Sequence, residues 1–339
     1  MSLQGRVKVS PITKKLFNYL CNGDIAVIRH NDIDELTAAA LVNIGVRAVI
    51  NTGATLTGRF RTTGAMPLLY GGVPLIDSRL GLDYFNDNDI VTIMANDIII
   101  NNTIYKNSCS VVDMEYVRKK LQEAEKNENG EVYRFICNTI RHAEKELAQI
   151  VGYAEYPNLH SKLEGRHVII VVRNKSSFDE LKALKNYIRS YDPVFIGVDG
   201  GADQIIKSGY IPDILIGDMD SVSDIGIYRS REIVLHAYED GTCPCLGRIN
   251  PMNVPYSIIR LKGTSEDAAL MLTYRKKAEL IVLVGGHSSM SDFLDKGREG
   301  MASTFIIRTL IGGKLVDCKG LEVVAASEAE GKDLRWAKI

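Results

Sequence analysis

The chain has 339 residues, of which 45% are hydrophobic and 24% charged, a balance that predicts two folded domains, each with its own core. A formal net charge of -1 gives no overall basic field, so nucleic acid is not an expected partner. No apolar stretch is long enough to cross a bilayer and no signal peptide is recognisable, so a cytoplasmic protein is expected.

Residues 1–110 are predicted to form a small mixed α/β module. A Gly/Thr-rich loop at 52–64 carries Arg59 and Arg61 and suits either an anionic ligand or packing against the rest of the module. The expected elements are helices at 12–20 and 34–44, the latter ended by Gly45, and strands at 25–28, 46–50, 89–93 and 97–100.

Residues 111–158 are predicted to be a helical linker. The densely charged stretch 115–126 is followed by Asn127-Glu128-Asn129-Gly130, which is expected to interrupt the helix. A second helix then places Val132, Phe135 and Ile136 at helical spacing. The pair is interpreted as a packed linker, with a spacer, a dimerisation arm or a lid as alternatives.

Residues 159–326 alternate strands and helices, which predicts a doubly wound, mostly parallel sheet; residues 327–339 are expected to be a tail. The near-continuous apolar run 167–172 is typical of a strand covered on both faces. Further strands are expected at 194–198, 213–216, 233–235, 258–261 and 280–284, and helices at 177–188, up to 208, at 266–274 and at 292–310.

Glycines and carboxylates follow the predicted strands, and ligand sites on such sheets lie at the carboxyl ends of the strands. The glycines let a backbone approach a phosphate closely, and the helix starts behind them offer N–H groups. The residues expected to contact a nucleotide or other phosphate are Gly200, Gly201, Asp203, Gly217, Ser221, Thr264, Ser265, Asp267, Gly285, Gly286 and His287.

Asp218 and Asp220, one residue apart, are predicted to hold Mg²⁺, with Asp199 beside them at the end of the preceding strand. Clustered carboxylates repel one another unless a cation holds them, and Mg²⁺ suits one or two carboxylates plus phosphate oxygens. Alternatively, Asp218 caps a helix and Asp199 closes a turn. The convergence of several such strand ends favours the phosphate or metal site.

The six cysteines form no C-x-x-C pair, and the nearest two are Cys243 and Cys245. Because a zinc site needs further ligands at metal-binding spacing, free thiols are expected.

The pairing of Asp199-Gly200-Gly201-Ala202-Asp203 with Gly217-Asp218-Met219-Asp220-Ser221 resembles the catalytic domain of thiamin pyrophosphokinases. The resemblance implies that fold, Mg²⁺ with ATP or another nucleotide, a homodimer, and catalytic roles for Asp199, Asp218 and Asp220. Two of that family's later motifs differ here, and only about thirty residues follow the last predicted helix, fewer than its β-sandwich needs.

A resemblance over nearly the whole chain, including residues 263–267 and 293–305, is to the SteA family, bacterial relatives of thiamin pyrophosphokinase assigned to the cytokinetic ring. It implies cell-division proteins as partners. Members commonly have a hydrophobic carboxy-terminal membrane segment, which residues 327–339 do not supply. In the predicted helix 292–310, Lys296 and Arg298 either neutralise phosphate oxygens or pair with Asp295 and Glu299.

Two functions are therefore expected, and a third, purely structural interpretation without a nucleotide does not explain why so many strand ends are acidic and glycine-rich. The favoured one is a nucleotide-binding assembly protein of cell division that retains the site for binding or regulation. The alternative is an active Mg²⁺-ATP-dependent pyrophosphokinase that transfers pyrophosphate to thiamin or another hydroxyl acceptor.

Overall fold

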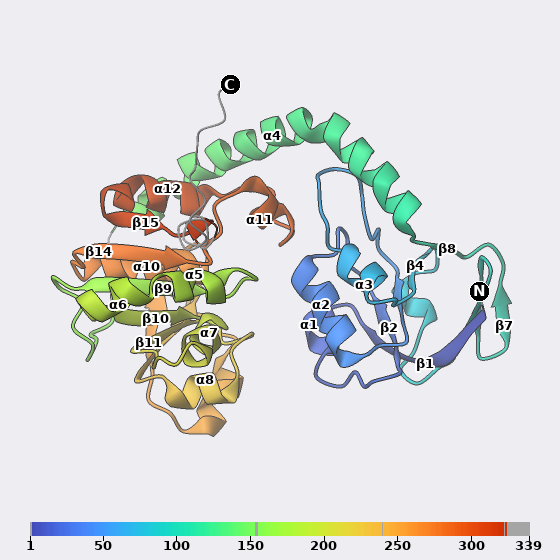
Figure 1. Cartoon of the computed structure of the whole chain (residues 1–339), viewed down its shortest axis with the longest axis horizontal. Coiled ribbons are helices and arrows are strands. Elements are labelled where there is room, and N and C mark those ends of the chain that lie inside the picture. Colours follow the sequence, from blue (N-terminus) through green and yellow to red (C-terminus); the bar gives the residue numbers. More distant parts are fainter. Residues whose placement is uncertain (1, 153–154, 239, 322, 324–339) are drawn as a thin grey trace. The chain divides into compact units, whose positions relative to one another are not determined.

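The computed structural model describes residues 2–152, 155–238, 240–321 and 323, so the predicted tail 327–339 lies outside the described residues. The chain divides into two compact units (Figure 1). Unit 1 comprises the residues up to Ile136 together with Ser289–Glu299, and unit 2 comprises Cys137–Ser288 and the residues from Gly300 on. No described helix combines the length and the apolar character needed to span a membrane.

Unit 1 is built on a mixed eight-stranded sheet in the order β7-β6-β5-β1-β2-β3-β4-β8. Strands β1 to β4 run parallel, and β5 and β8 join them antiparallel at either side. The strands are β1 (Ser2–Ser10), β2 (Ile25–Ile28), β3 (Ala48–Asn51), β4 (Leu75–Ser78), β5 (Ile90–Met94), β6 (Asp97–Ile100), β7 (Thr103–Tyr105) and β8 (Cys109–Val111).

Alternation along these strands gives unit 1 two cores. Ala26, Ile28 and Val49 pack on one face against helices, and Ile25 and Val27 pack on the other face with side chains of β5 and β6. The helices are α1 (Thr13–Leu16), α2 (Glu35–Ile44), α3 (Met66–Tyr70), α11 (Met290–Leu294) and the short η1 (Leu82–Tyr84).

Helix α4 (Met114–Val151) is one continuous helix of 38 residues, so the predicted interruption at residues 127–130 is wrong. Val117 and Ala124 are buried before that stretch, and Glu131 and Phe135 are buried after it. A single glycine costs a helix only about 1 kcal/mol. Packing on both sides of residues 127–130 outweighs this cost.

Unit 2 is built on a seven-stranded sheet, parallel throughout, in the order β13-β12-β11-β10-β9-β14-β15. The chain steps from β9 outward to β13 and then returns to β14, on the other side of β9, so the strand order reverses between β9 and β14. The strands are β9 (His167–Val172), β10 (Val194–Val198), β11 (Ile214–Gly217), β12 (Glu232–Ala237), β13 (Ser257–Arg260), β14 (Leu280–Val284) and β15 (Leu315–Asp317).

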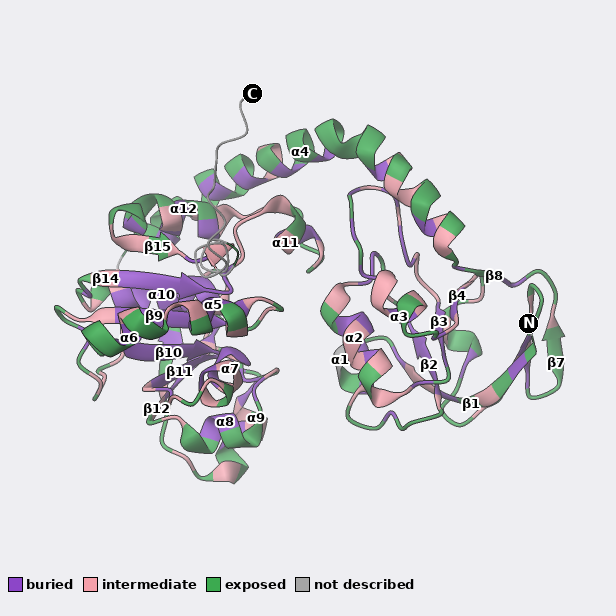
Figure 2. Cartoon of the chain, viewed as in Figure 1, coloured by how far each residue is buried: buried purple, intermediate pink, exposed green. Residues whose placement is uncertain are grey.

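Helices cover both faces of this sheet. Val168 and Ile170 pack with side chains of α10 and α12 in one core, whereas Ile169 and Val171 pack with side chains of α5, α6 and α7 in another. Strands β9, β10 and β14 are accordingly buried in Figure 2. The helices are α5 (Ser177–Ala183), α6 (Lys185–Tyr191), α7 (Gly201–Lys207), α8 (Asp224–Arg229), α9 (Leu246–Ile249), α10 (Ser265–Arg275) and α12 (Ala302–Ile311), with short turns η2 (Asn250–Met252) and η3 (Gly312–Lys314).

The predicted α/β class, with a parallel carboxy-terminal sheet and a mixed amino-terminal unit, is confirmed. Several boundaries are corrected. The helix predicted at 177–188 is two helices, α5 and α6, and the one at 292–310 is interrupted by residues 295–301, which separate α11 from α12. Strands β1, β4, β7, β8 and β15 were not predicted.

We predict that Gly130→Ala stabilises the protein. Gly130 is an exposed residue inside α4, and a Cβ there would meet nothing within 4 Å. Alanine removes backbone freedom from the unfolded chain, so the free energy of unfolding is expected to rise by about 0.5–1 kcal/mol. Thermal unfolding measures the change. A lower melting temperature would show that the helix is strained or bent at this position.

Candidate cation and phosphate site

Asp199 is the first residue after β10. Its N–H donates to the carbonyl of Ile216 (3.0 Å), so the residue stays paired with β11 beyond the end of its own strand. Its φ of 47° is in the left-handed region, which aspartate tolerates better than most residues. The side chain is thereby held against the turn that follows β11.

That turn, Gly217-Asp218-Met219-Asp220, is shaped around the Asp199 carboxylate. A Cβ at position 217 would lie 1.9 Å from Asp199 Oδ1, and Gly217 has φ 152°, so only glycine fits here. The Met219 N–H donates to Asp199 Oδ1 (2.9 Å), while the Met219 side chain is fully buried in the core. With Met219 anchored inward, its neighbours Asp218 and Asp220 are exposed.

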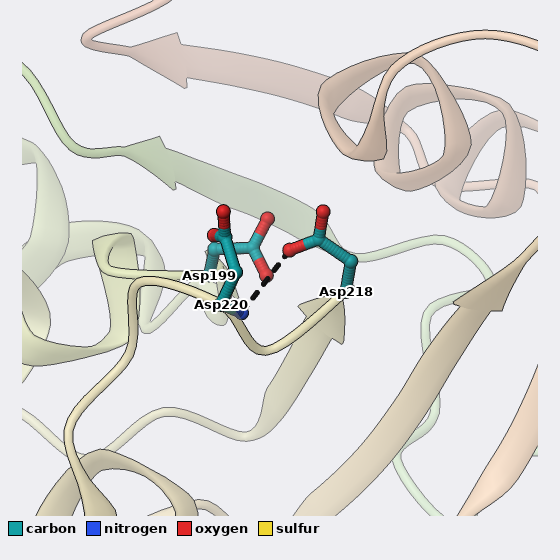
Figure 3. Close-up of side chains that lie close together, drawn as sticks. All are labelled: Asp199, Asp218 and Asp220. Carbon is teal, nitrogen blue, oxygen red and sulfur yellow. Dashed lines mark hydrogen bonds between the residues drawn. The ribbon is translucent and has the colours of Figure 1, made fainter. Parts of the chain in front are cut away.

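The three carboxylates converge. Figure 3 shows Asp199, Asp218 and Asp220 gathered at the ends of β10 and β11, and one oxygen from each lies within 4.8 Å of the others. The Asp220 N–H also donates to Asp218 Oδ1 (3.1 Å). Burial, and after it the negative charge of Asp218, raises the pKa of Asp199 to about 7.

Two further contacts fix this turn, and sequence reasoning missed the residue that makes them. Arg248, from α9, donates from Nη1 to the carbonyl of Met219 and from Nη2 to the carbonyl of Val222 (2.9 Å). It also pairs with Asp224 (2.6 Å). Its signal in the sequence was slight, because α9 is four residues long and stands far from the turn along the chain.

Asp203 holds two helices together and does not join the three clustered carboxylates. Its carboxylate accepts from the N–H (2.9 Å) and the hydroxyl (2.5 Å) of Ser223, the residue that caps α8. It therefore joins α7 to α8, and its predicted phosphate contact has no support from this geometry. Ser221 lies next to the site, with its hydroxyl 3.4 Å from the N–H of Gly200.

Asp267 is fully buried and holds two helices together. It forms a capping box with Thr264 at the start of α10. The hydroxyls of Ser303 (2.7 Å) and Thr304 (2.9 Å) from α12 also donate to it. Burial raises the pKa of this carboxyl. The side chains of Thr264 and Asp267 thus hydrogen-bond to each other's backbone N–H groups. Ser265 is the residue of this segment that contacts the cluster of Asp199, Asp218 and Asp220.

Ser265 connects α10 to the acidic cluster. Its hydroxyl bonds to Asp199, a contact that lowers the pKa of that carboxyl against the larger effect of burial. Ser265 Oγ lies 3.4 Å from His236 Nδ1, and His236 Nε2 lies 2.8 Å from the carbonyl of Leu261.

The loop after β14 is held by buried carboxylates. The N–H of Gly285 donates to Glu180 (2.7 Å), and the N–H of His287 donates to Glu266 (3.1 Å). The same Glu266 oxygen lies 2.9 Å from His287 Nδ1, and Arg308 pairs with Glu266 (3.4 Å). The predicted phosphate loop of Gly285, Gly286 and His287 is therefore held by hydrogen bonds from its backbone to two buried carboxylates.

The remaining predicted ligands lie in unit 1. Lys296 and Arg298 are exposed and follow α11 in the segment Ser289–Glu299, not in a helix. In the same unit Arg59 pairs with the buried Glu131 (3.0 Å) and with Glu299 (3.2 Å). The packing interpretation of the Gly/Thr-rich loop therefore fits Arg59 better than anion binding.

The six cysteines are free thiols, as predicted. Cys243 and Cys245 are buried with their sulfurs 3.2 Å apart. Burial raises the pKa of Cys245 to about 12.

The three carboxylates suit a hard divalent cation. Carboxylate oxygen is the preferred donor for Mg²⁺, Mn²⁺ and Ca²⁺, and Mg²⁺ commonly completes its shell with water and phosphate oxygens. Gly217 leaves the space that Asp199 needs, and the two exposed carboxylates leave a side open to solvent. Asp199, Asp218 and Asp220 are therefore the residues that fit a cation.

Comparisons with known proteins place the chain in no family. No protein-family model and no curated protein matches it. Among 12 matching solved chains, 3-isopropylmalate dehydratase from Methanocaldococcus jannaschii is 18% identical over 38% of this chain and 96% of that chain, with a TM-score of 0.25. Thiamine pyrophosphokinase from Bacillus subtilis is 21% identical over 39% of this chain and 52% of that chain (TM-score 0.26), and a protein from Lactobacillus plantarum is 14% identical over 39% and 53% (TM-score 0.23). These are slight likenesses of fold and carry no conclusion about function.

We predict that Asp199→Asn stabilises the cation-free protein, and more so at high pH. The pKa of Asp199 is about 7 in the folded protein, against an ordinary value of 3.8 for an aspartate. Ionisation therefore costs the folded state more than the unfolded chain, so stability falls as pH rises from about 4 to about 7 and stays low above. Asparagine keeps the acceptor for Met219 and tolerates positive φ.

In EDTA at pH 8 the melting temperature of Asp199→Asn is expected to exceed that of the wild type by about 2–4 °C. At pH 4.5 the gain should be much smaller. An equal gain at both pH values would mean that the carboxylate is not destabilised by ionisation.

Proposed function

We propose that this protein binds a divalent cation, Mg²⁺ under cellular conditions, together with a phosphate-bearing ligand such as a nucleotide. The observation that carries the proposal is the convergence of Asp199, Asp218 and Asp220, with one oxygen of each within 4.8 Å of the others. They stand at the carboxyl ends of adjacent parallel strands, where α/β sheets place their ligands.

A purely structural role explains these carboxylates less well. Asp203 and Asp267 show what a structural carboxylate does at this edge, because each accepts from hydroxyl and amide donors that tie two helices together. Asp218 and Asp220 differ from them in being exposed. The backbone of the cluster contains two left-handed residues, Asp199 and Met219, and the obligatory Gly217. A bound cation would offset the repulsion that this backbone imposes.

We infer a binding or regulatory site in preference to a transfer enzyme. The observation that favours this is the internal bracing of the loop after β14, since Gly285 and His287 donate their N–H groups to Glu180 and Glu266. The cell-division setting that we propose rests on the sequence resemblance to the SteA family, and the homodimer rests on the resemblance to thiamin pyrophosphokinases.

Removing either exposed carboxylate is expected to abolish most cation binding. Asp218→Asn and Asp220→Asn should each weaken Mn²⁺ binding at least tenfold, measured by the electron paramagnetic resonance signal of free Mn²⁺, because each removes a charged ligand. Asp179→Asn is the matched control, since Asp179 is an exposed carboxylate in the first turn of α5. Equal Mn²⁺ affinity in all four proteins would refute the site.

AMP release from Mg²⁺-ATP, measured by chromatography with and without thiamin, separates binding from transfer. We expect ATP to bind without thiamin-dependent AMP. Thiamin-dependent AMP that disappears in Asp218→Asn would instead establish a working pyrophosphokinase.

A further inference from the structure

The acidic site attracts a cation but needs another group to recognise an anion. Four N–H groups at this edge of unit 2 are already used, and those of Thr264 and Asp267 serve the capping box. Those of Gly285 and His287 serve Glu180 and Glu266. These four groups are not open to a phosphate, so other donors at this edge become candidates for its recognition.

Arg173 is such a partner. It directly follows β9, one of the two strands between which the strand order reverses, and it is exposed. The next residue, Asn174, accepts from the N–H groups of Ser176 and Ser177 (both 2.8 Å), which fixes the backbone where Arg173 stands. Sequence reasoning missed this residue because a single arginine after a strand has no distinctive spacing.

The guanidinium of Arg173 lies across the backbone of both acidic strand ends. Its Nη1 donates to the carbonyl of Ser221 (3.1 Å), the residue after Asp220. Its Nε and Cζ lie against Gly200, the residue after Asp199, where a Cβ would come within 2.8–2.9 Å of them. A side chain at position 200 would therefore displace the guanidinium from this position.

Arg173 nevertheless pairs with none of the three carboxylates. Within the described part of the chain its guanidinium makes that one hydrogen bond, to a backbone carbonyl, and no ion pair. An arginine that makes a single hydrogen bond to a backbone carbonyl keeps its other N–H donors for a further acceptor. Guanidinium donors match the oxygens of a phosphate, to which they bind in a bidentate manner.

We propose that Arg173 is the phosphate-binding residue of this site, and that the ligand is a polyphosphate held between Arg173 and the cation. The inference rests on the proposed cation site. The Arg173 guanidinium donates hydrogen bonds to the phosphate oxygens of the ligand, while its contacts with Gly200 and Ser221 hold it in place.

The test uses the full chain with Mn²⁺ and two probes, inorganic pyrophosphate and ATP. The wild type is compared with Arg173→Gln and Arg173→Lys, and with Arg189→Gln, which changes an exposed arginine of α6 as the control. Mn²⁺ binding is measured alone, and calorimetry then measures each probe in the presence of Mn²⁺. Circular dichroism confirms that each variant is folded.

Arg173→Gln should bind Mn²⁺ within twofold of the wild type but bind both probes about 10–100-fold more weakly, the loss typical of charge-assisted hydrogen bonds. Arg173→Lys should lie between, because an ammonium keeps the charge without the bidentate geometry. A loss for ATP alone would show that Arg173 contacts the nucleoside instead, and would overturn the proposal.

Failures of the two proposals are distinguishable. If Mn²⁺ binds and the probes bind equally to wild type and Arg173→Gln, the role of Arg173 is refuted and the proposed function stands. If Mn²⁺ binds but neither probe binds the wild type, the role of Arg173 and the phosphate ligand of the proposed function both fail, and only the cation site stands. If Mn²⁺ does not bind to the wild type, the proposed function fails and this inference fails with it.

Discussion

Electrostatic repulsion among three carboxylates is the constraint around which the carboxyl edge of unit 2 is organised. Two like charges about 4 Å apart repel by roughly 1 kcal/mol in water and about 4 kcal/mol near a protein surface. The fold does not relieve this repulsion by turning the side chains away. It enforces the cluster through Gly217, through the Met219 N–H bound to Asp199, and through Arg248 on the carbonyls of the turn. A cation is the natural counterpart of such an arrangement.

The other charges of this edge are balanced within the protein. Glu266 pairs with His287 and Arg308, and Arg308 also forms an ion pair with Asp317 (2.8 Å). Glu180 accepts from the hydroxyl of Ser176 (2.6 Å) and the N–H of Gly285. Buried charges need partners of this kind, because an unpaired one costs several kcal/mol. Glu180 and Glu266 are thereby tied to the fold, whereas Asp218 and Asp220, which also follow a strand, are exposed.

The sequence predicted the site carboxylates because their signal is local. A strand that is apolar throughout, followed by glycine and aspartate, indicates a strand end, and parallel topology brings such ends together. The structural role of Asp267 was not predictable in this way, because its hydrogen-bond donors Ser303 and Thr304 lie on α12, more than thirty residues further along the chain. Likewise, Gly130 indicated a break in α4 that packing on both sides of it overrides.

The hydrogen bonds that occupy the N–H groups of Gly285 and His287 bear on whether this edge can support phosphoryl transfer. Phosphoryl transfer depends on donors that surround the transferred group and stabilise its developing charge. At this edge the N–H groups of Gly285 and His287 are bound to carboxylates, whose negative charge would also oppose an approaching phosphate. A ligand held by a cation and one exposed guanidinium is anchored at few points. Such anchoring suits reversible binding better than the rigid positioning on which catalysis depends.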